Sequence, residues 1–193
     1  MSEISIACAE PARLGRSLRT WRTLRRMKQH HAAELLGVSQ TTISRWENGL
    51  QAPTPAEQSD IRRLMQARLD SAADRELARL VRQSTAEVHL ICDLTHRLLD
   101  LSPARARMWS VPATDLLGTS LWRYASKEIV TAERNLPQAG WFEPAPPALE
   151  LDTGANGSSV VRIRPSRLKW VRFQLSDGSF ARLVQTVAAA AAA

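Results

Sequence analysis

The chain of 193 residues has only two cysteines, Cys8 and Cys92, and no long run of apolar residues. Two isolated thiols form neither a CxxC pair nor a zinc-ligand spacing, and they are typical of a protein in a reducing compartment. Because a membrane-spanning helix needs about 20 apolar residues, we expect no membrane span. Residues 1–5 lack the basic start and apolar centre of a secretory signal, so we expect a cytoplasmic protein.

Basic residues outnumber acidic ones by 26 to 19, which gives a formal net charge of +7. This balance favours a polyanionic partner. Seven basic residues fall between Arg13 and Lys28 with no acidic residue among them. All but three of the basic residues are arginine, which binds phosphate through a planar fork, although such a bias is also typical of a GC-rich genome.

Helical periodicity is absent from residues 1–10, which we expect to form a flexible arm. Apolar residues then recur three and four positions apart, on one face of an amphipathic helix, at Leu14, Leu18, Trp21 and Leu24. The pattern predicts a first helix whose opposite face carries several arginines.

Two short helices are expected next, at residues 29–36 and 39–49. Gly37 ends the first, Ser39 caps the second, and Ala33 is small at the point where the two helices cross. The residues of the second helix that we expect to face inward are Ile43, Trp46 and Leu50. This combination predicts a helix-turn-helix.

The outward face of the second short helix is polar and contains no acidic residue. Its members are Gln40, Thr41, Ser44, Arg45 and Asn48. Glutamine pairs with adenine, arginine pairs with guanine, and the threonine methyl contacts the thymine methyl. An ordinary exposed helix is polar too, but it usually carries Glu or Lys, so we interpret this face as one that enters the major groove of double-stranded DNA.

Residues 14–64 resemble the DNA-binding domain of lambda-repressor-like regulators of the XRE family. The matching positions are Leu18-Arg19, Trp21-Arg22, Gln29, Ala33, Gly37-Val38-Ser39-Gln40, Ile43 to Gly49, and Pro53. The chain departs from the family at Lys28, where a Ser or Thr cap is usual, and at Arg26, where glycine is common.

The face and the resemblance together give a set of candidate site residues. The predicted base-reading residues are Gln40, Thr41, Ser44 and Arg45. The predicted phosphate-binding residues are Arg19, Lys28, Gln29 and Asn48, with Arg13 and Arg16 as further phosphate neighbours. The resemblance implies a structural ion pair between Arg22 and Glu47.

Residues 53–84 continue the helical pattern. Thr54, Pro55 and Glu57 predict a capping box with proline in the first turn. An apolar stripe follows and could extend a helix towards Ser84; its members are Ile61, Met65, Leu69, Ala73, Leu77 and Leu80. The stripe has two interpretations, a connector or dimer seam and a helix packed on its own domain.

The second half of the chain predicts an α+β domain. Strands are expected at residues 88–92, 98–101, 149–153, 160–164, 168–175 and 180–187, and helices at 103–109 and 127–136. Residues 87–187 resemble a PAS domain in the order and spacing of these elements. The resemblance implies a five-stranded sheet that either encloses a small apolar ligand or serves as a dimer face. His89 and His96 do not identify a cofactor.

Signals of catalysis are weak. Ala139-Gly140 is the dipeptide that self-cleaving repressors cut, and Ser166 and Lys169 offer a nucleophile and a base. The segment after Gly140 is too short for such a catalytic sheet, and the chain has no HExxH motif or glycine-rich phosphate loop. We expect a protein that is not an enzyme and that has no cofactor or metal site.

The expected domains are a flexible arm (1–10), a helix-turn-helix domain (11–70), a helical connector (71–86), a PAS-like sensory or dimerisation domain (87–187) and an alanine tail (188–193). The sequence thus predicts a bacterial, sequence-specific transcriptional regulator, a repressor or an activator, that binds an inverted-repeat operator as a homodimer and is nucleoid-associated when bound. The alternative is an adaptor or antiactivator that binds another regulator or RNA polymerase through the C-terminal domain.

Overall fold

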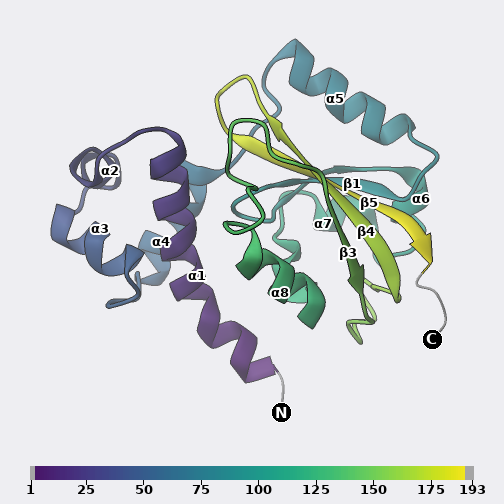
Figure 1. Cartoon of the computed structure of the whole chain (residues 1–193), viewed down its shortest axis with the longest axis horizontal. Helices are drawn as coiled ribbons and strands as arrows, with labels where there is room; N and C mark the ends of the chain where they lie inside the picture. Colours follow the sequence, from purple (N-terminus) through teal and green to yellow (C-terminus); the bar gives the residue numbers. More distant parts are fainter. Residues whose placement is uncertain (1–2, 190–193) are drawn as a thin grey trace. The chain divides into compact units, whose positions relative to one another are not determined.

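The computed structural model describes the backbone of residues 3–189 and the side chains of residues 13–187. Contacts divide the chain into two compact units, Met1–Gln66 and Ala67–Ala193. The first unit is helical and the second contains a β-sheet (Figure 1). The predicted fold class is therefore confirmed, although the division falls after Gln66 rather than after residue 70. In the described part of the chain, no helix is long and apolar enough to cross a membrane.

Within the described residues, the first unit contains four helices. Their bounds are Glu3–Leu24 for α1, Gln29–Leu36 for α2, Gln40–Glu47 for α3 and Pro55–Met65 for α4. The expected flexible arm is wrong for residues 3–10, which belong to α1. That expectation relied on apolar periodicity, whereas the Ala and Glu residues of this segment favour a helix through intrinsic propensity alone.

The core of the helical unit joins α1, α3 and α4. Leu18, Ile43, Trp46 and Ile61 are fully buried there. The expectation that Leu50 faces inward is wrong, because its side chain is 78% exposed. Helix α3 ends at Glu47, so Leu50 no longer follows the helical period that places Ile43 and Trp46 in the core.

Helices α1 and α3 approach each other closely at Gly15. A Cβ atom on Gly15 would lie 2.0 Å from the carbonyl oxygen of Trp46 and 2.7 Å from its carbonyl carbon. The backbone of α1 therefore contacts the backbone of α3 with no room for a side chain. Only glycine fits at this position without moving the two helices apart.

Local signals fix the ends of the short helices as predicted. Gly37 has φ +64° in the left-handed region and ends α2. The Ser39 hydroxyl accepts from the amide of Thr42 at 3.1 Å at the start of α3. Thr54 and Glu57 form the predicted capping box of α4.

Helix α5, Ala72–Gln83, is separate from α4, so the expectation of one continuous helix through the apolar stripe is wrong. Ser71 caps α5 and diverts the chain, and the amide of Ser71 donates to Asp74 at 3.2 Å. Asp74 also accepts from the hydroxyl of Ser176 at 2.7 Å, in the hairpin between the last two strands. These bonds lower the pKa of Asp74 despite the opposing effect of its desolvation. Helix α5 packs on its own unit, as the second interpretation of the apolar stripe expects.

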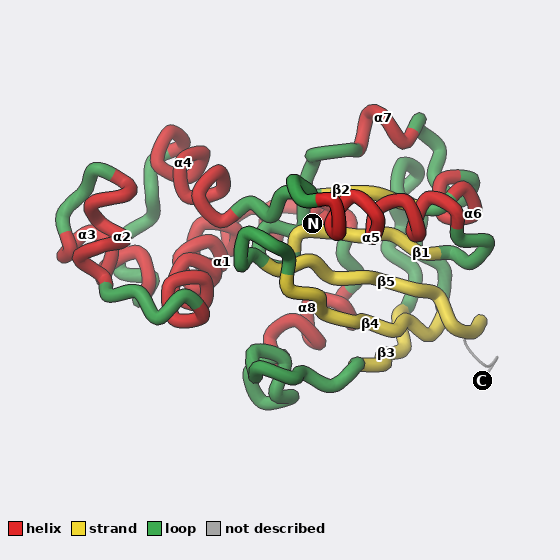
Figure 2. Tube along the Cα trace, turned by 90° about the horizontal axis from the view of Figure 1, so that it is seen from above, coloured by secondary structure: helices red, strands yellow, loops and turns green. Residues whose placement is uncertain are grey.

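The second unit contains a five-stranded antiparallel sheet with the order β2-β1-β5-β4-β3. The strand bounds are Val88–Cys92 (β1), Leu98–Leu101 (β2), Leu149–Thr153 (β3), Ser166–Gln174 (β4) and Phe180–Ala189 (β5). Figure 2 shows β5 between β1 and β4. The sheet has the five strands that the resemblance to a PAS domain implies. Of the predicted alanine tail, residues 190–193 lie outside the described residues.

The sheet has an apolar cluster on each face. Leu77 and Val81 of α5 pack with Leu90 of β1 on one face. On the other face, Ile91 joins a cluster with Trp170 of β4, against residues of the short helices α6 (Pro103–Ala106), α7 (Ala113–Leu116) and α8 (Lys127–Asn135). A 3-10 helix, Leu121–Tyr124, lies between α7 and α8 along the chain. The sheet is therefore covered by helices on both faces.

The strand expected at residues 160–164 is wrong, because these residues form a loop beside the sheet. The side chain of Asn156 holds the loop: its amide donates to the carbonyl of Val161 at 2.8 Å, and its oxygen accepts from the amide of Ile163 at 3.0 Å. Val161 is buried in the core, so its apolar character reflects packing rather than a strand.

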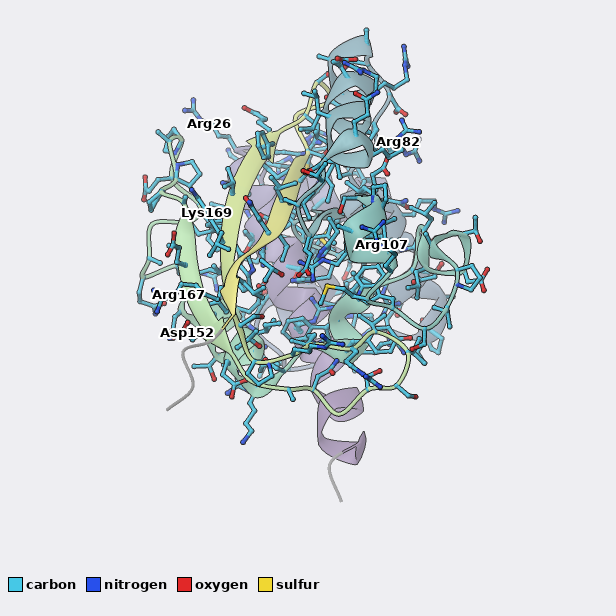
Figure 3. The ribbon with its side chains drawn as sticks, turned by 90° about the vertical axis from the view of Figure 1, so that its right-hand side faces the viewer. Arg26, Arg82, Arg107, Asp152, Arg167 and Lys169 are labelled. Atoms are coloured by element: carbon cyan, nitrogen blue, oxygen red, sulfur yellow. The ribbon has the colours of Figure 1, made fainter. Side chains whose placement is uncertain are left out.

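A network of charged side chains lies within the second unit. Asp93 is fully buried and accepts from Arg182 at 2.8 Å, from Arg172 at 3.2 Å and from the indole of Trp141 at 3.1 Å. Arg182 also forms an ion pair with Glu133 of α8, with 2.7 Å between Nη1 and Oε2. The network joins β4 and β5 to the turn after β1 and to α8. A separate ion pair, Arg167 with Asp152, lies at the exposed β3–β4 edge (Figure 3).

Candidate nucleic-acid interface

Glu47, the last residue of α3, is buried and connects three helices. Arg22 of α1 donates to it from Nε and Nη2 at 2.8 and 2.9 Å, and Gln29 of α2 donates from Nε2 at 2.9 Å. Arg22 also donates to the carbonyl of Met27 at 2.8 Å. The hydrogen bonds to Glu47 raise the pKa of Arg22 above its ordinary value. The predicted ion pair is present, and it fixes α3 against α1 and α2.

Gln29 has a second contact that sequence reasoning missed. Because its Nε2 donates to Glu47, its Oε1 faces the other way and accepts from Nε2 of Gln40 at 3.5 Å. The amide of Gln40, a predicted base-reading residue, is thus oriented through Gln29 by the buried carboxylate. No pattern within either short helix reveals this link, since it joins residues on two helices.

The N-terminal part of α3 carries the predicted base-reading residues on its exposed side. Gln40, Thr41 and Arg45 are exposed, and Ser44 is half-buried. The first turn of α3 contains no acidic residue. This face can donate and accept hydrogen bonds at base edges without a carboxylate that would repel the DNA backbone.

The N-terminus of α2 presents a second group of donors. Lys28 occupies the N-cap position in extended conformation and is exposed, and its side chain makes no capping hydrogen bond. The first turn of α2 has no acidic residue. Free amides and the positive end of the helix dipole favour a phosphate here, and Lys28 adds a full charge.

An open hollow lies where α1 passes the end of α3. It is lined by Arg16, Arg19, Thr20, Glu47, Asn48 and Gly49. The hollow brings together Arg19 and Asn48, two of the predicted phosphate-binding residues, and adds Arg16. Two guanidinium groups beside a backbone turn form a surface that suits a phosphate.

Asn48 lies at the C-cap of α3 and packs back on that helix. Its Nδ2 donates to the carbonyl of Ser44 at 2.9 Å and lies 3.5 Å from the Ser44 hydroxyl. One of its two N–H groups is therefore used within the helix, and Ser44 is partly covered. We expect Ser44 to contribute less to base reading than Gln40, Thr41 and Arg45.

Arg26 has φ +52°, a conformation that is rare for residues other than glycine. Glycine adopts this conformation without the steric cost that a Cβ atom brings. Among the described residues, no group of three or more His, Cys, Asp or Glu side chains is placed to hold a metal ion.

Comparison with known proteins supports the helical part of this description. Residues 13–80 match a family described as a helix-turn-helix domain. No curated protein matches the chain. The chain is similar to the solved structure of an RNA-binding light-oxygen-voltage receptor, with a TM-score of 0.41 and 12% sequence identity. That similarity covers 96% of this chain and 62% of the receptor chain.

Proposed function

We propose that the protein is a sequence-specific DNA-binding transcriptional regulator that acts as a homodimer on an inverted-repeat operator. The observation that carries the proposal is the exposed, acid-free face of α3, with Gln40, Thr41 and Arg45, in the unit that matches a helix-turn-helix domain. Lys28 at the start of α2 and the hollow with Arg19 supply phosphate contacts on the same unit.

A single small unit reads few base pairs, so a dimer with half-sites about one helical turn apart is the arrangement that gives an adequate operator. The α+β unit supplies dimerisation, effector sensing or both. Its own sheet and two apolar clusters make it a compact body that can serve either role.

The test begins with selection of bound duplexes from a random DNA pool by the full-length protein at moderate salt. We expect an enriched inverted repeat. Fluorescence anisotropy on that operator and on single-base variants then compares Gln40→Ala, Lys28→Ala and the control Lys127→Ala, which removes the same charge from an exposed site on α8.

Gln40→Ala should cost about 1–3 kcal/mol and relax the preference at one base pair. Lys28→Ala should weaken all duplexes alike and reduce the salt slope by about one unit, while Lys127→Ala should behave as the unmodified protein. If no motif is enriched and the first two variants bind like the control, the proposal is wrong. The adaptor that binds another regulator or RNA polymerase then becomes the better hypothesis.

A further inference from the structure

Arg26, in the turn between α1 and α2, adopts a backbone conformation that its side chain disfavours. Among the described residues, only Arg26 and His96 have a positive φ without being glycine. The amide of Arg26 donates to the carbonyl of Thr23 at 3.0 Å, a bond that ends α1 in a left-handed turn. Glycine is the usual residue in such a turn, so the turn itself does not explain an arginine.

The side chain of Arg26 adds no contact that would compensate for this conformation. It is exposed and extends into solvent (Figure 3), and among the described residues its guanidinium takes part in no hydrogen bond, ion pair or ring contact. Arg22, in contrast, is paired with Glu47. Arg25 lies over the ring of Trp21, 5.3 Å from its centroid. A strained residue without a partner in the folded chain indicates a partner outside it.

The turn that carries Arg26 is fixed relative to α3. Nη1 of Arg22 donates to the carbonyl of Met27 at 2.8 Å, and Nε and Nη2 of the same guanidinium donate to Glu47 at the end of α3. One side chain therefore holds both the turn and the helix. Because Met27 directly follows Arg26, a phosphate bound by Arg26 would lie in a fixed register with the bases that α3 contacts.

The surroundings of Arg26 along the chain are basic. Lys28 lies two residues further on, is exposed, and makes no capping hydrogen bond at the start of α2. No acidic residue lies between Glu10 and Glu34 in the sequence. Glu47, which is joined to this turn through its ion pair, is buried and already neutralised. Arg26 and Lys28 thus form an unbalanced positive pair, which a nucleic-acid backbone neutralises with release of its counterions.

We propose that Arg26 binds a backbone phosphate of the operator, beside the phosphate that Lys28 contacts, and that this contact is the reason for an arginine in a strained turn. The inference rests on the proposed DNA-binding function and adds a contact outside the polar face of α3. Because every duplex presents the same phosphate oxygens, the contact raises the affinity for all sequences alike and leaves the base preference unchanged.

The test uses the full-length protein and the operator selected above, with fluorescence anisotropy titrations between about 50 and 200 mM salt. Arg26→Gly removes the charge and relieves the positive φ. We expect this variant to melt at a higher temperature than the unmodified protein and yet to bind the operator severalfold more weakly. Its salt slope should be smaller by about one unit for each protomer bound. A loss of affinity caused by poorer folding would lower the melting temperature instead.

Three further variants separate the charge from the backbone. Arg26→Asn tolerates the left-handed conformation but has no charge, so it should lose as much of the salt slope as Arg26→Gly. Arg26→Lys keeps the charge and the strain, so it should keep the slope. Arg107→Asn is the matched control, since it removes an exposed arginine from the second unit and should leave the slope unchanged. Selection repeated with Arg26→Gly should enrich the same motif.

The outcomes distinguish this inference from the proposed function. An operator that is enriched and bound with equal salt slopes by the unmodified protein, Arg26→Gly and Arg26→Asn would overturn the inference alone. A reduced slope in Arg26→Lys, or a different motif selected by Arg26→Gly, would also contradict a simple phosphate contact. If the unmodified protein enriches no motif, the proposed function is refuted and the inference is refuted with it.

Discussion

Replacing Gly15 with alanine tests the packing of α1 against α3, because intrinsic propensity and the structure predict opposite signs for the change in stability. Alanine within a helix is more favourable than glycine by about 1 kcal/mol, so propensity alone predicts stabilisation. In the structure the new Cβ would lie 2.0 Å from the carbonyl oxygen of Trp46. That oxygen also accepts from the amide of Gly49 at 3.1 Å, so it cannot move without disturbing the end of α3.

The size of the effect follows from this distance. Carbon and oxygen atoms in contact lie about 3.4 Å apart or more, so α1 and α3 must separate by about 1 Å or more. Overpacking of this kind costs about 1–3 kcal/mol, and the shift also loosens the contacts of Trp46 and Leu18. After the gain in propensity, we expect a net loss of about 2 kcal/mol, which lowers the melting temperature of the helical unit by about 8–16 °C.

Differential scanning calorimetry of the full chain measures the shift, and hydrogen exchange in peptides from residues 14–65 assigns the transition to the helical unit. Thr23→Ala, at an exposed position of the same helix, is the control and should be neutral or slightly stabilising. A Gly15→Ala variant that melts at or above the unmodified protein would refute the close approach of α1 and α3.

Further predictions concern two carboxylates, Glu47 and Glu133, and one strained residue, Arg26. Glu47→Ala should destabilise the helical unit by about 2–4 kcal/mol in urea unfolding, because its donors lose their acceptor; a loss below 1 kcal/mol would contradict the role of Glu47. Arg26→Gly should stabilise the same unit by about 0.5–1 kcal/mol by relieving the positive φ, and unchanged or lower stability would contradict that strain. The charges of Arg182 and His96 lower the pKa of Glu133 below its ordinary value, so its contribution to stability is present above about pH 4.5 and is lost as the pH falls towards the folded-state pKa. Urea unfolding between pH 3 and 7 should therefore show a steep acid loss in the second unit that Glu133→Gln flattens, and equal slopes would exclude this carboxylate as the cause.

Local chemistry made most of the helical unit predictable. Gly37, Ser39 and the Thr54 capping box act within one turn of a helix, so their signals are contained in a few consecutive residues. The strand of residues 88–92 was also predicted with its observed ends, because turn residues follow it directly.

The features that sequence reasoning missed depend on residues far apart in the chain. The need for glycine at position 15 arises from Trp46 on another helix. The break after α4 is stabilised by Asp74 through a contact with Ser176. Val161 resembles a strand residue because it is buried, yet its backbone bonds to Asn156 instead of a neighbouring strand. A single sequence carries the propensity of each segment but not these partners.

The candidate site shows the same contrast between local features, which the sequence predicts, and contacts between distant residues, which it does not. The exposed positions of Gln40, Thr41 and Arg45 follow from the helical period and were predicted, as was the pairing of Arg22 with Glu47 through the family resemblance. The orientation of Gln40 by Gln29 was not, because side-chain amides have two equivalent-looking ends that only the three-dimensional neighbours distinguish.

The position of β5 has a consequence for how the protein is made. This strand is the last of the five along the chain, yet it lies at the centre of the sheet and is the only described strand that joins the β1–β2 hairpin to the β3–β4 hairpin. During synthesis the two hairpins therefore cannot join into one sheet until β5 leaves the ribosome. The described helices of the first unit have emerged before that point. A nascent chain stopped before residue 180 would carry a complete helical unit followed by an unassembled sheet with open edges, which is a target for quality control.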